Sequence, residues 1–179
     1  VGPLLPLHAR ARRNLHRAMP ELPTVDVERA LGEMWRNLGR VAAEYPHLQK
    51  FQAYMPGGRI EVVGVEHLVT AKEETQGALF FTGHLSNWEV SGLPLIQYGI
   101  PITFVYRAPN NPYVDRLISR IRGRYITENA IAKGASGARE MVRRVRDGGY
   151  TAMLVDQKMS DGIAVPFFGR DAMTAPALA

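Results

Sequence analysis

One short segment carries the residue types of an acid–base site. The apolar run 78–82 is followed directly by Gly83-His84-Leu85-Ser86-Asn87-Trp88-Glu89. Histidine is the side chain best suited to accept a proton near neutral pH, and a nearby carboxylate can hold its tautomer. We predict that His84 is a general base in a turn between a strand and a helix that begins near Ser86, with Glu89 as its orienting partner. The competing interpretation is a capping box, in which Glu89 binds the backbone N–H of Ser86.

Backbone groups and polar strand ends are expected to complete this site. The free N–H groups of the helix start near Ser86 and Asn87 would suit an oxyanion or a phosphate. Asn87 is therefore a candidate substrate-binding residue.

Two other predicted strands also end in polar residues. One leads into Arg107 and Asn110, and the other leads into Asp156 and Gln157. Because α/β sheets bind ligands at the carboxyl ends of their strands, we expect these side chains to share one crevice with His84. Arg107 is suited to a bidentate grip on phosphate, and Asp156 could orient Arg107 or a substrate group. The alternative for Arg107 is a salt bridge at the end of its strand, and the alternative for Asp156 is a cap on the following loop.

An aromatic segment and two arginine clusters are further candidates. The apolar segment 165–169 contains Phe167 and Phe168 and is expected to be a loop that lines a pocket for an aliphatic chain or covers the core. The clusters comprise Arg120, Arg122 and Arg124, and then Arg139, Arg143, Arg144 and Arg146. Each cluster is interpreted either as a contact face for phospholipid or an acidic carrier protein, or as the solvated face of a helix.

The elements that must position these residues follow from hydrophobic periodicity. Spacing of three and four residues predicts helices over 24–45, 112–121 and 138–145, and a basic amphipathic segment covers 10–17. An alternating run predicts an edge or half-buried strand over 59–63. Apolar runs predict buried strands over 77–82 and 151–155 and a further strand over 102–106. The alternation predicts an α/β fold with a mixed, largely parallel central sheet flanked by helices. We expect a single domain over residues 1–179 that lacks both termini of a longer protein.

Composition narrows the possible chemistry. The chain has no cysteine, which excludes disulfides, thiolate metal sites and a cysteine nucleophile. It contains no run of about 18 apolar residues, and it has no glycine-rich nucleotide loop, serine-nucleophile elbow or metal-ligand spacing. The net charge is +5 with 22 Lys and Arg residues, which suits an acidic partner such as anionic lipid, phosphate, an acidic carrier protein or nucleic acid.

An ordered set of sequence blocks runs over nearly the whole chain: 13–15, 19–22, 83–89, 105–112, Gly134 with Gly137, 155–158, 165–169 and Thr174. This set resembles the late acyltransferases of lipid A biosynthesis, the lauroyl/myristoyl transferase group. The His-x4-Glu spacing of that group is a form of the glycerolipid acyltransferase signature. The resemblance implies transfer of a fatty acyl group from acyl carrier protein to a hydroxyl of a lipid A precursor of the Kdo-lipid IVA type. His84 would be the base and Glu89 its partner, without an acyl-enzyme, a metal or another cofactor.

The resemblance also implies where the protein acts and with what. The acceptor lipid places the reaction at the cytoplasmic face of the bacterial inner membrane, on an anionic surface, and nucleic acid has no role. Three alternatives stay open. The first is the same chemistry with acyl-CoA on another glycolipid, such as a phosphatidylinositol mannoside, and the second is a non-catalytic lipid- or carrier-binding protein. The third, a nucleotide-dependent enzyme, lacks a phosphate loop.

Overall fold

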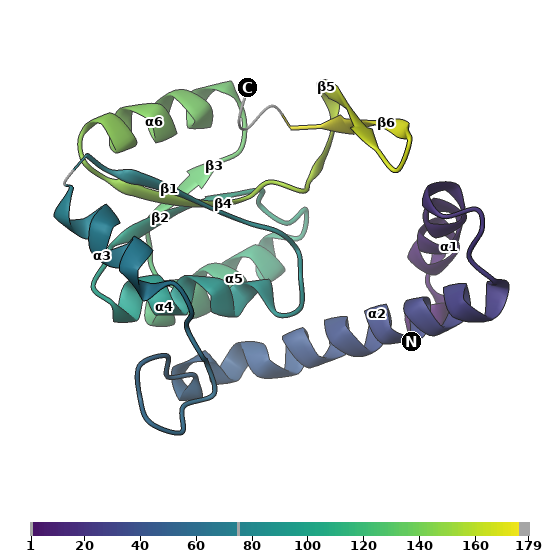
Figure 1. Ribbon diagram of the computed structural model, residues 1–179, viewed down its shortest axis with the longest axis horizontal. Coiled ribbons are helices and arrows are strands. Elements are labelled where there is room, and N and C mark those ends of the chain that lie inside the picture. Colours follow the sequence, from purple (N-terminus) through teal and green to yellow (C-terminus); the bar gives the residue numbers. More distant parts are fainter. Residues whose placement is uncertain (1, 75, 176–179) are drawn as a thin grey trace. The chain divides into compact units, whose positions relative to one another are not determined.

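The computed structural model describes residues 2–74 and 76–175 of the chain (Figure 1). The chain divides into two compact units, one formed by Val1–Ala43 with Asp156–Ala179 and the other by Glu44–Val155. We describe each unit by itself. The α/β class predicted from the sequence is confirmed.

The second unit is built on a four-stranded sheet with strand order β1-β4-β2-β3. The strands are β1 (Ala78–Thr82), β2 (Ile102–Tyr106), β3 (Ala130–Ala132) and β4 (Tyr150–Leu154). Every pairing in the sheet is parallel, with Thr82 opposite Leu154 and Val105 opposite Met153. The carboxyl ends of these strands therefore lie at one edge of the sheet, which is where α/β folds place their ligands.

Helices cover both faces of this sheet. They are η2 (Tyr45–Lys50), α3 (Val65–Glu73), η3 (Trp88–Gly92), α4 (Leu93–Gln97), α5 (Pro112–Tyr125) and α6 (Ala135–Arg146). Figure 1 shows α6 on one face and α4 and α5 on the other. Side chains agree with these layers, because Arg144 of α6 donates to the Thr103 hydroxyl while Ile102 packs in the cluster that contains Ile126.

The core of the second unit lies between the sheet and the α4–α5 layer. Its buried members are Leu48, Leu93, Leu95, Ile100, Ile102, Ile126 and Ala152. Phe104, Ile121 and Tyr125 pack against this cluster from the sheet and from α5. Burial of these side chains fixes the rotation of α5 about its axis, and this rotation decides which of its arginines face inward.

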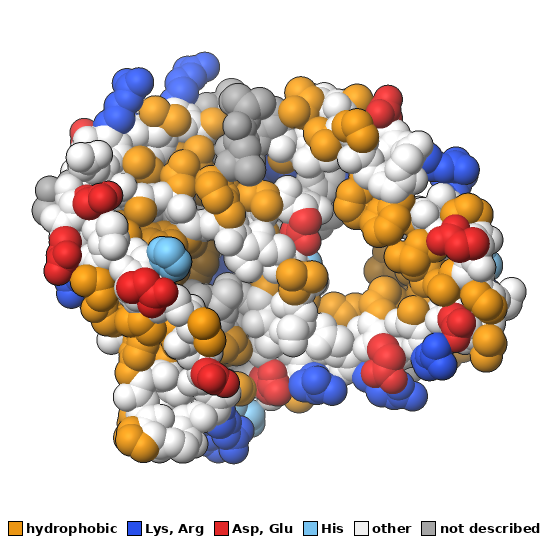
Figure 2. Space-filling view, in the orientation of Figure 1, with side chains coloured by type: hydrophobic (Ala, Val, Ile, Leu, Met, Phe, Trp, Pro, Cys, Tyr) orange, Lys and Arg blue, Asp and Glu red, His pale blue; other side chains and the backbone are white. Residues whose placement is uncertain are grey.

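The first unit contains two helices and a hairpin. Following η1 (Gly2–Leu4), the helices are α1 (Pro6–Ala18) and α2 (Thr24–Glu44), and the strands are β5 (Lys158–Phe167) and β6 (Arg170–Thr174), which pair antiparallel. The Trp35 indole N–H of α2 donates to His8 of α1 over 3.0 Å. Acidic and basic side chains alternate along the outer face of α2 (Figure 2), where Arg29 pairs with Asp26 and Arg36 with Glu33.

Three predictions about individual elements were wrong or incomplete. Residues 59–63 form no strand, since their polar–apolar alternation finds no neighbouring strand to pair with. The strand predicted over 77–82 was expected to be buried, but β1 is an edge strand of its sheet, and its Leu79 and Phe81 are exposed. The segment 165–169 was expected to be a loop, but its first three residues belong to β5 and only the last two form the turn.

Candidate functional site

His84 follows β1 at the carboxyl edge of the sheet. Gly83 separates it from the last strand residue, and the histidine lies in the loop that precedes η3. Its side chain is exposed, and its ring centroid lies 5.2 Å from that of Trp88 at an interplanar angle of 59°. The position agrees with the predicted strand-to-helix turn, although the helix begins at Trp88 instead of near Ser86.

Asn87 begins the short helix that carries Glu89. Its side-chain oxygen accepts a hydrogen bond from the backbone N–H of Glu89 at 3.2 Å, so Asn87 is the N-cap. Ser86 takes a left-handed backbone conformation with φ of 46° just before the cap. The capping-box alternative, in which Ser86 would be the N-cap, is therefore not the geometry found. The backbone carbonyl of Asn87 also accepts a hydrogen bond from the Val90 N–H, so a second N–H group at this helix start already has a partner.

The Glu89 carboxylate forms a two-point ion pair with Arg122 of α5. Arg122 Nη2 donates to Glu89 Oε1 at 2.6 Å, and Arg122 Nε donates to Oε2 at 3.1 Å. The Trp88 indole N–H adds a third hydrogen bond to Oε1 at 3.2 Å. The Glu89 and Arg122 side chains are only 10% and 23% exposed. A paired fork of this kind fixes both the position and the plane of the carboxylate.

This pair corrects our interpretation of the first arginine cluster. Arg122 was grouped with Arg120 and Arg124 on a face open to solvent or to a partner, yet it points inward to Glu89. A signal was present in the sequence, because Arg122 lies four residues after Ile118 and so continues the apolar stripe of its helix. The partner could not be found from the sequence, since 33 positions separate the two residues.

The Tyr45 side chain closes the other side of this ion pair. Its hydroxyl is buried and makes no hydrogen bond of normal geometry with the residues the structure describes. Burial, together with the negative charge of Glu89, raises the pKa of Tyr45 far above its usual value. The pKa of Arg122 is also raised: burial opposes this, but the hydrogen bonds and charge of Glu89 outweigh it.

Glu44 supports the same turn from the end of α2. Its Oε2 accepts a hydrogen bond from Asn87 Nδ2 at 2.7 Å. Glu44 and Tyr45 are neighbours in sequence, so one short segment contacts both the cap residue and the ion pair. Neither residue was predicted from the sequence, because both lie at the end of the helix predicted over 24–45, whose pattern indicates packing.

The other candidate residues are distributed over both units. Arg107 follows β2 at the same sheet edge as His84, is exposed, and donates to Asn110 Oδ1 at 3.4 Å. Asp156 and Gln157 follow β4 and belong to the first unit, as do Phe167 and Phe168. These two phenylalanines are exposed at the β5–β6 turn, with ring centroids 4.7 Å apart in an edge-to-face arrangement.

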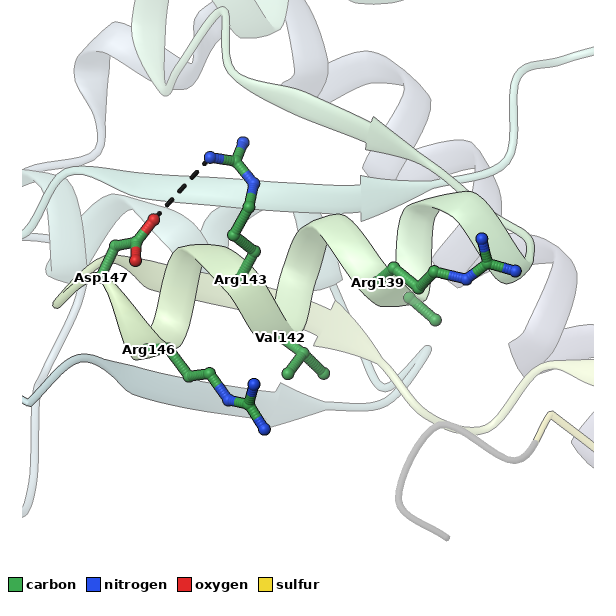
Figure 3. Close-up of a pocket in the computed structure, with 6 residues that line it drawn as sticks. Arg139, Val142, Arg143, Arg146 and Asp147 are labelled. Atoms are coloured by element: carbon green, nitrogen blue, oxygen red, sulfur yellow. Dashed lines mark ion pairs between the residues drawn. The ribbon is translucent and has the colours of Figure 1, made fainter.

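A shallow hollow lies on the surface of α6. Ala138, Arg139, Val142, Arg143, Arg146 and Asp147 line it. Figure 3 shows the ion pair between Arg143 and Asp147, whose atoms are 3.8 Å apart. Arg139 and Arg146 extend from the helix and form no ion pair with the residues that the structure describes. Among residues 2–74 and 76–175, no cluster of three His, Asp or Glu side chains could hold a metal ion. Across the same ranges, no helix is both long and apolar enough to cross a bilayer.

Comparison with known proteins agrees with the sequence blocks. The chain is similar to the lipid A biosynthesis acyltransferase of Haemophilus influenzae, with 28% identity over an alignment that covers 94% of this chain. The chain spans about half, 53%, of the length of that curated relative. A family model described as bacterial lipid A biosynthesis acyltransferase matches residues 6–179. A match over that much of the chain shows that the protein belongs to the bacterial lipid A biosynthesis acyltransferase family.

Proposed function

We propose that the protein transfers a fatty acyl group from acyl carrier protein to a hydroxyl of a lipid A precursor of the Kdo-lipid IVA type. Family membership supports the reaction class. The observation that carries the assignment to particular residues is the turn at 83–89, where an exposed histidine at the carboxyl edge of the sheet is followed by a carboxylate anchored by Arg122.

In this mechanism His84 removes the proton from the acceptor hydroxyl. The resulting oxygen attacks the thioester carbonyl carbon, the tetrahedral intermediate collapses, and the C–S bond breaks. The imidazolium returns its proton to the leaving thiolate, so the products are an ester and a free thiol. No bond to the enzyme forms at any stage.

Glu89 would hold the imidazole in the productive tautomer and stabilise its charged form. A carboxylate has about four acceptor positions. The printed hydrogen bonds place two donors on Oε1 and one on Oε2, so they do not use every acceptor position of the carboxylate. The Arg122 fork would therefore position Glu89 for its role without preventing it.

The remaining candidates are assigned to substrate. Arg107 and Asn110 would bind a phosphate of the acceptor, with Asn87, Asp156 and Gln157 contributing polar contacts. Phe167 and Phe168 would contact the acyl chain. The acceptor lipid would place the reaction on the anionic cytoplasmic face of the bacterial inner membrane.

The test follows transfer of a labelled acyl group from acyl carrier protein to a tetra-acylated lipid A precursor by the intact protein. Wild type is compared with His84→Ala, Glu89→Gln and the control His47→Ala, since His47 is an exposed histidine in η2. We expect the first two variants to lose at least about a hundredfold in rate, the scale of a general base, and the control to retain activity.

Other results would change the assignment. Equal rates for wild type and His84→Ala would remove the histidine from the mechanism. Transfer from acyl-CoA to a mannosylated lipid, with none from the carrier, would replace both substrates. Tight lipid or carrier binding without any transfer would indicate a binding protein.

A further inference from the structure

The outer face of α5 is an exposed surface that mixes apolar and cationic side chains. Helical spacing places Tyr113, Arg116, Leu117, Arg120 and Arg124 on one side of the helix. We call these five residues the α5 outer face. Tyr113 is 76% exposed and Leu117 is 56% exposed, so this side of the helix presents apolar surface to solvent. The opposite side of the helix packs on the core through Ile121 and on Glu89 through Arg122.

The positive charge of this face is not neutralised within the described residues. Arg116 stacks over the Tyr113 ring at 5.7 Å and Arg124 over the Tyr125 ring at 5.5 Å. No ion pair joins Arg116, Arg120 or Arg124 to a carboxylate anywhere in residues 2–74 and 76–175. On α6, Glu140 pairs with both Arg143 and Arg144, while Arg139 and Arg146 have no ion pair among the described residues.

The location of this face connects it to the proposed reaction. Asn111 caps α5 by accepting from the backbone N–H groups of Tyr113 and Val114, just beyond the carboxyl end of β2. The first turn of α5 therefore begins at the sheet edge where His84 follows β1. Val114, also exposed, extends the apolar part of the surface in this turn.

The composition of the face indicates the kind of partner. Arginine and tyrosine are enriched at protein interfaces, where an apolar centre is surrounded by polar groups. The three arginines are spaced one helical turn apart, roughly 6 Å, which matches a row of carboxylates on an approaching helix. Helices that lie in a bilayer surface instead separate apolar and basic residues onto different faces, whereas Arg120 lies on the same face as Tyr113 and Leu117.

We propose that the α5 outer face docks an acidic helix of a partner protein, with Leu117 and Tyr113 as apolar anchors and the arginines as its charged contacts. This inference rests on the proposed function, under which the partner is the acyl carrier protein that delivers the thioester. Docking there would bring the donor to the sheet edge that holds His84.

The experiment compares two variants with the same change in charge. Arg116→Glu/Arg120→Glu alters the α5 outer face, and Arg139→Glu/Arg146→Glu alters two arginines of α6 that have no ion pair in the described structure (Figure 3). Affinity for fluorescently labelled acyl carrier protein is measured by anisotropy across a salt series, with circular dichroism as the folding check. Leu117→Ala is a second, uncharged variant that tests the apolar contact.

We expect the α5 double variant to lose about tenfold or more in affinity and most of the salt dependence. Leu117→Ala should also weaken binding, while the α6 variant should bind within about twofold of wild type. In the transfer assay the α5 variant should show a raised KM for the carrier. Its rate with a small acyl-pantetheine thioester should stay unchanged, because that donor needs no protein contact.

Several outcomes would overturn the proposal. Equal weakening by the α5 and α6 variants would show a general charge effect. Unchanged carrier binding by the α5 variant, with lost sedimentation on phosphatidylglycerol vesicles, would assign the face to lipid. A loss of folding in all α5 variants would mean that the protein itself covers this face. Failure of wild type to transfer from any donor would contradict the proposed function, whereas normal transfer with an unaffected α5 variant would contradict only the docking site.

Discussion

Arg122 Nη2 lies 2.6 Å from Glu89 Oε1, and this contact ties the second half of α5 to the turn that carries the candidate base. The two residues are 33 positions apart in the sequence, and their elements η3 and α5 pack on the same face of the sheet as the core. The carboxylate that we assign to orienting His84 is thus held by an arginine that has no assigned contact with substrate. Arg122 is a positioning residue in this arrangement.

Loss of the Arg122 guanidinium should destabilise the protein and reduce activity. Arg122→Met leaves Glu89 buried without its cation, which typically costs about 3–5 kcal/mol. The double variant Arg122→Met/Glu89→Leu removes both charges and should recover much of the free energy of unfolding while remaining inactive. Urea unfolding measures the stability, and the transfer assay measures the activity.

Arg139→Met is the matched control for this substitution, because Arg139 is exposed on α6 and has no ion pair among the described residues. It should change stability by less than about 0.5 kcal/mol. A single Arg122 variant as stable as this control would contradict the structural role of the ion pair.

The Tyr45 hydroxyl should make the protein less stable at alkaline pH. Burial and the charge of Glu89 raise the pKa of Tyr45 in the folded state above the value of 10.0 of an unperturbed tyrosine. Above that pH the unfolded chain loses the tyrosine proton before the folded protein does, so the free energy of unfolding falls as pH rises. Tyr45→Phe removes this effect and also removes a buried hydroxyl that makes no hydrogen bond of normal geometry with the described residues.

We therefore expect Tyr45→Phe to be at least as stable as wild type at pH 8 and clearly more stable at pH 11, as measured by urea unfolding. Tyr113→Phe changes an exposed tyrosine on α5 and serves as the control. If the difference between Tyr45→Phe and wild type does not grow between the two pH values, the hydroxyl titrates as it does in the unfolded chain.

Replacement of Asn87 by aspartate should place two carboxylates in contact. Asn87 Nδ2 donates to Glu44 over 2.7 Å, so Asn87→Asp replaces a donor with a second negative group. Repulsion raises the pKa values of such a pair, so the folded protein binds more protons than the unfolded chain. The variant should be destabilised at pH 7, and the loss should shrink as pH falls toward about 4.

Asn111→Asp is a matched change at the N-cap of α5, where aspartate also caps well and suits the positive end of the helix dipole. It should be neutral or slightly stabilising at pH 7. Equal losses for the two variants would show that capping, not the contact with Glu44, determines the cost.

Gly92 should not tolerate even a methyl group. A Cβ atom there would lie 2.6 Å from Phe104 Cζ and 3.2 Å from Ile126 Cγ2, inside the layer between η3 and the sheet. Gly92→Ala should cost about 1–3 kcal/mol through overpacking. Gly39→Ala in α2, where no atom lies within 4 Å of such a Cβ, should instead stabilise by up to about 1 kcal/mol. Thermal unfolding of the two variants checks the contrast.

Local features of the sequence determined most of the elements. The sequence predicted the bounds of α2 within a few residues, because its apolar stripe starts at Thr24 and ends before Pro46. It also predicted the bounds of β1, β2 and β4 from their apolar runs. These features depend on short-range spacing and on proline and glycine, so a single sequence contains them. The parallel arrangement followed from the alternation of helix and strand, as did the placement of His84 and Arg107 at one edge.

Pairing over long distances had to come from the tertiary structure. Residues 59–63 have the pattern of a strand, but a strand exists only where a neighbour completes its hydrogen bonds, and the described part of the chain supplies none. The three-residue strand β3 gave no periodic signal, yet it pairs with β2 at the sheet edge. The hairpin of β5 and β6 likewise depends on two segments finding a common register.

The same division applies to the candidate site. Residue types and a five-residue spacing determined by themselves that His84 and Glu89 were the pair to consider, because a base and its partner can be recognised from their own chemistry. Only the tertiary structure decided that Glu89 binds Arg122, that Tyr45 and Glu44 support the turn, and that Arg116 and Arg120 stay exposed on the same helix. The physical reason is that the direction of each arginine depends on how the core rotates α5, and the core is a property of the folded chain.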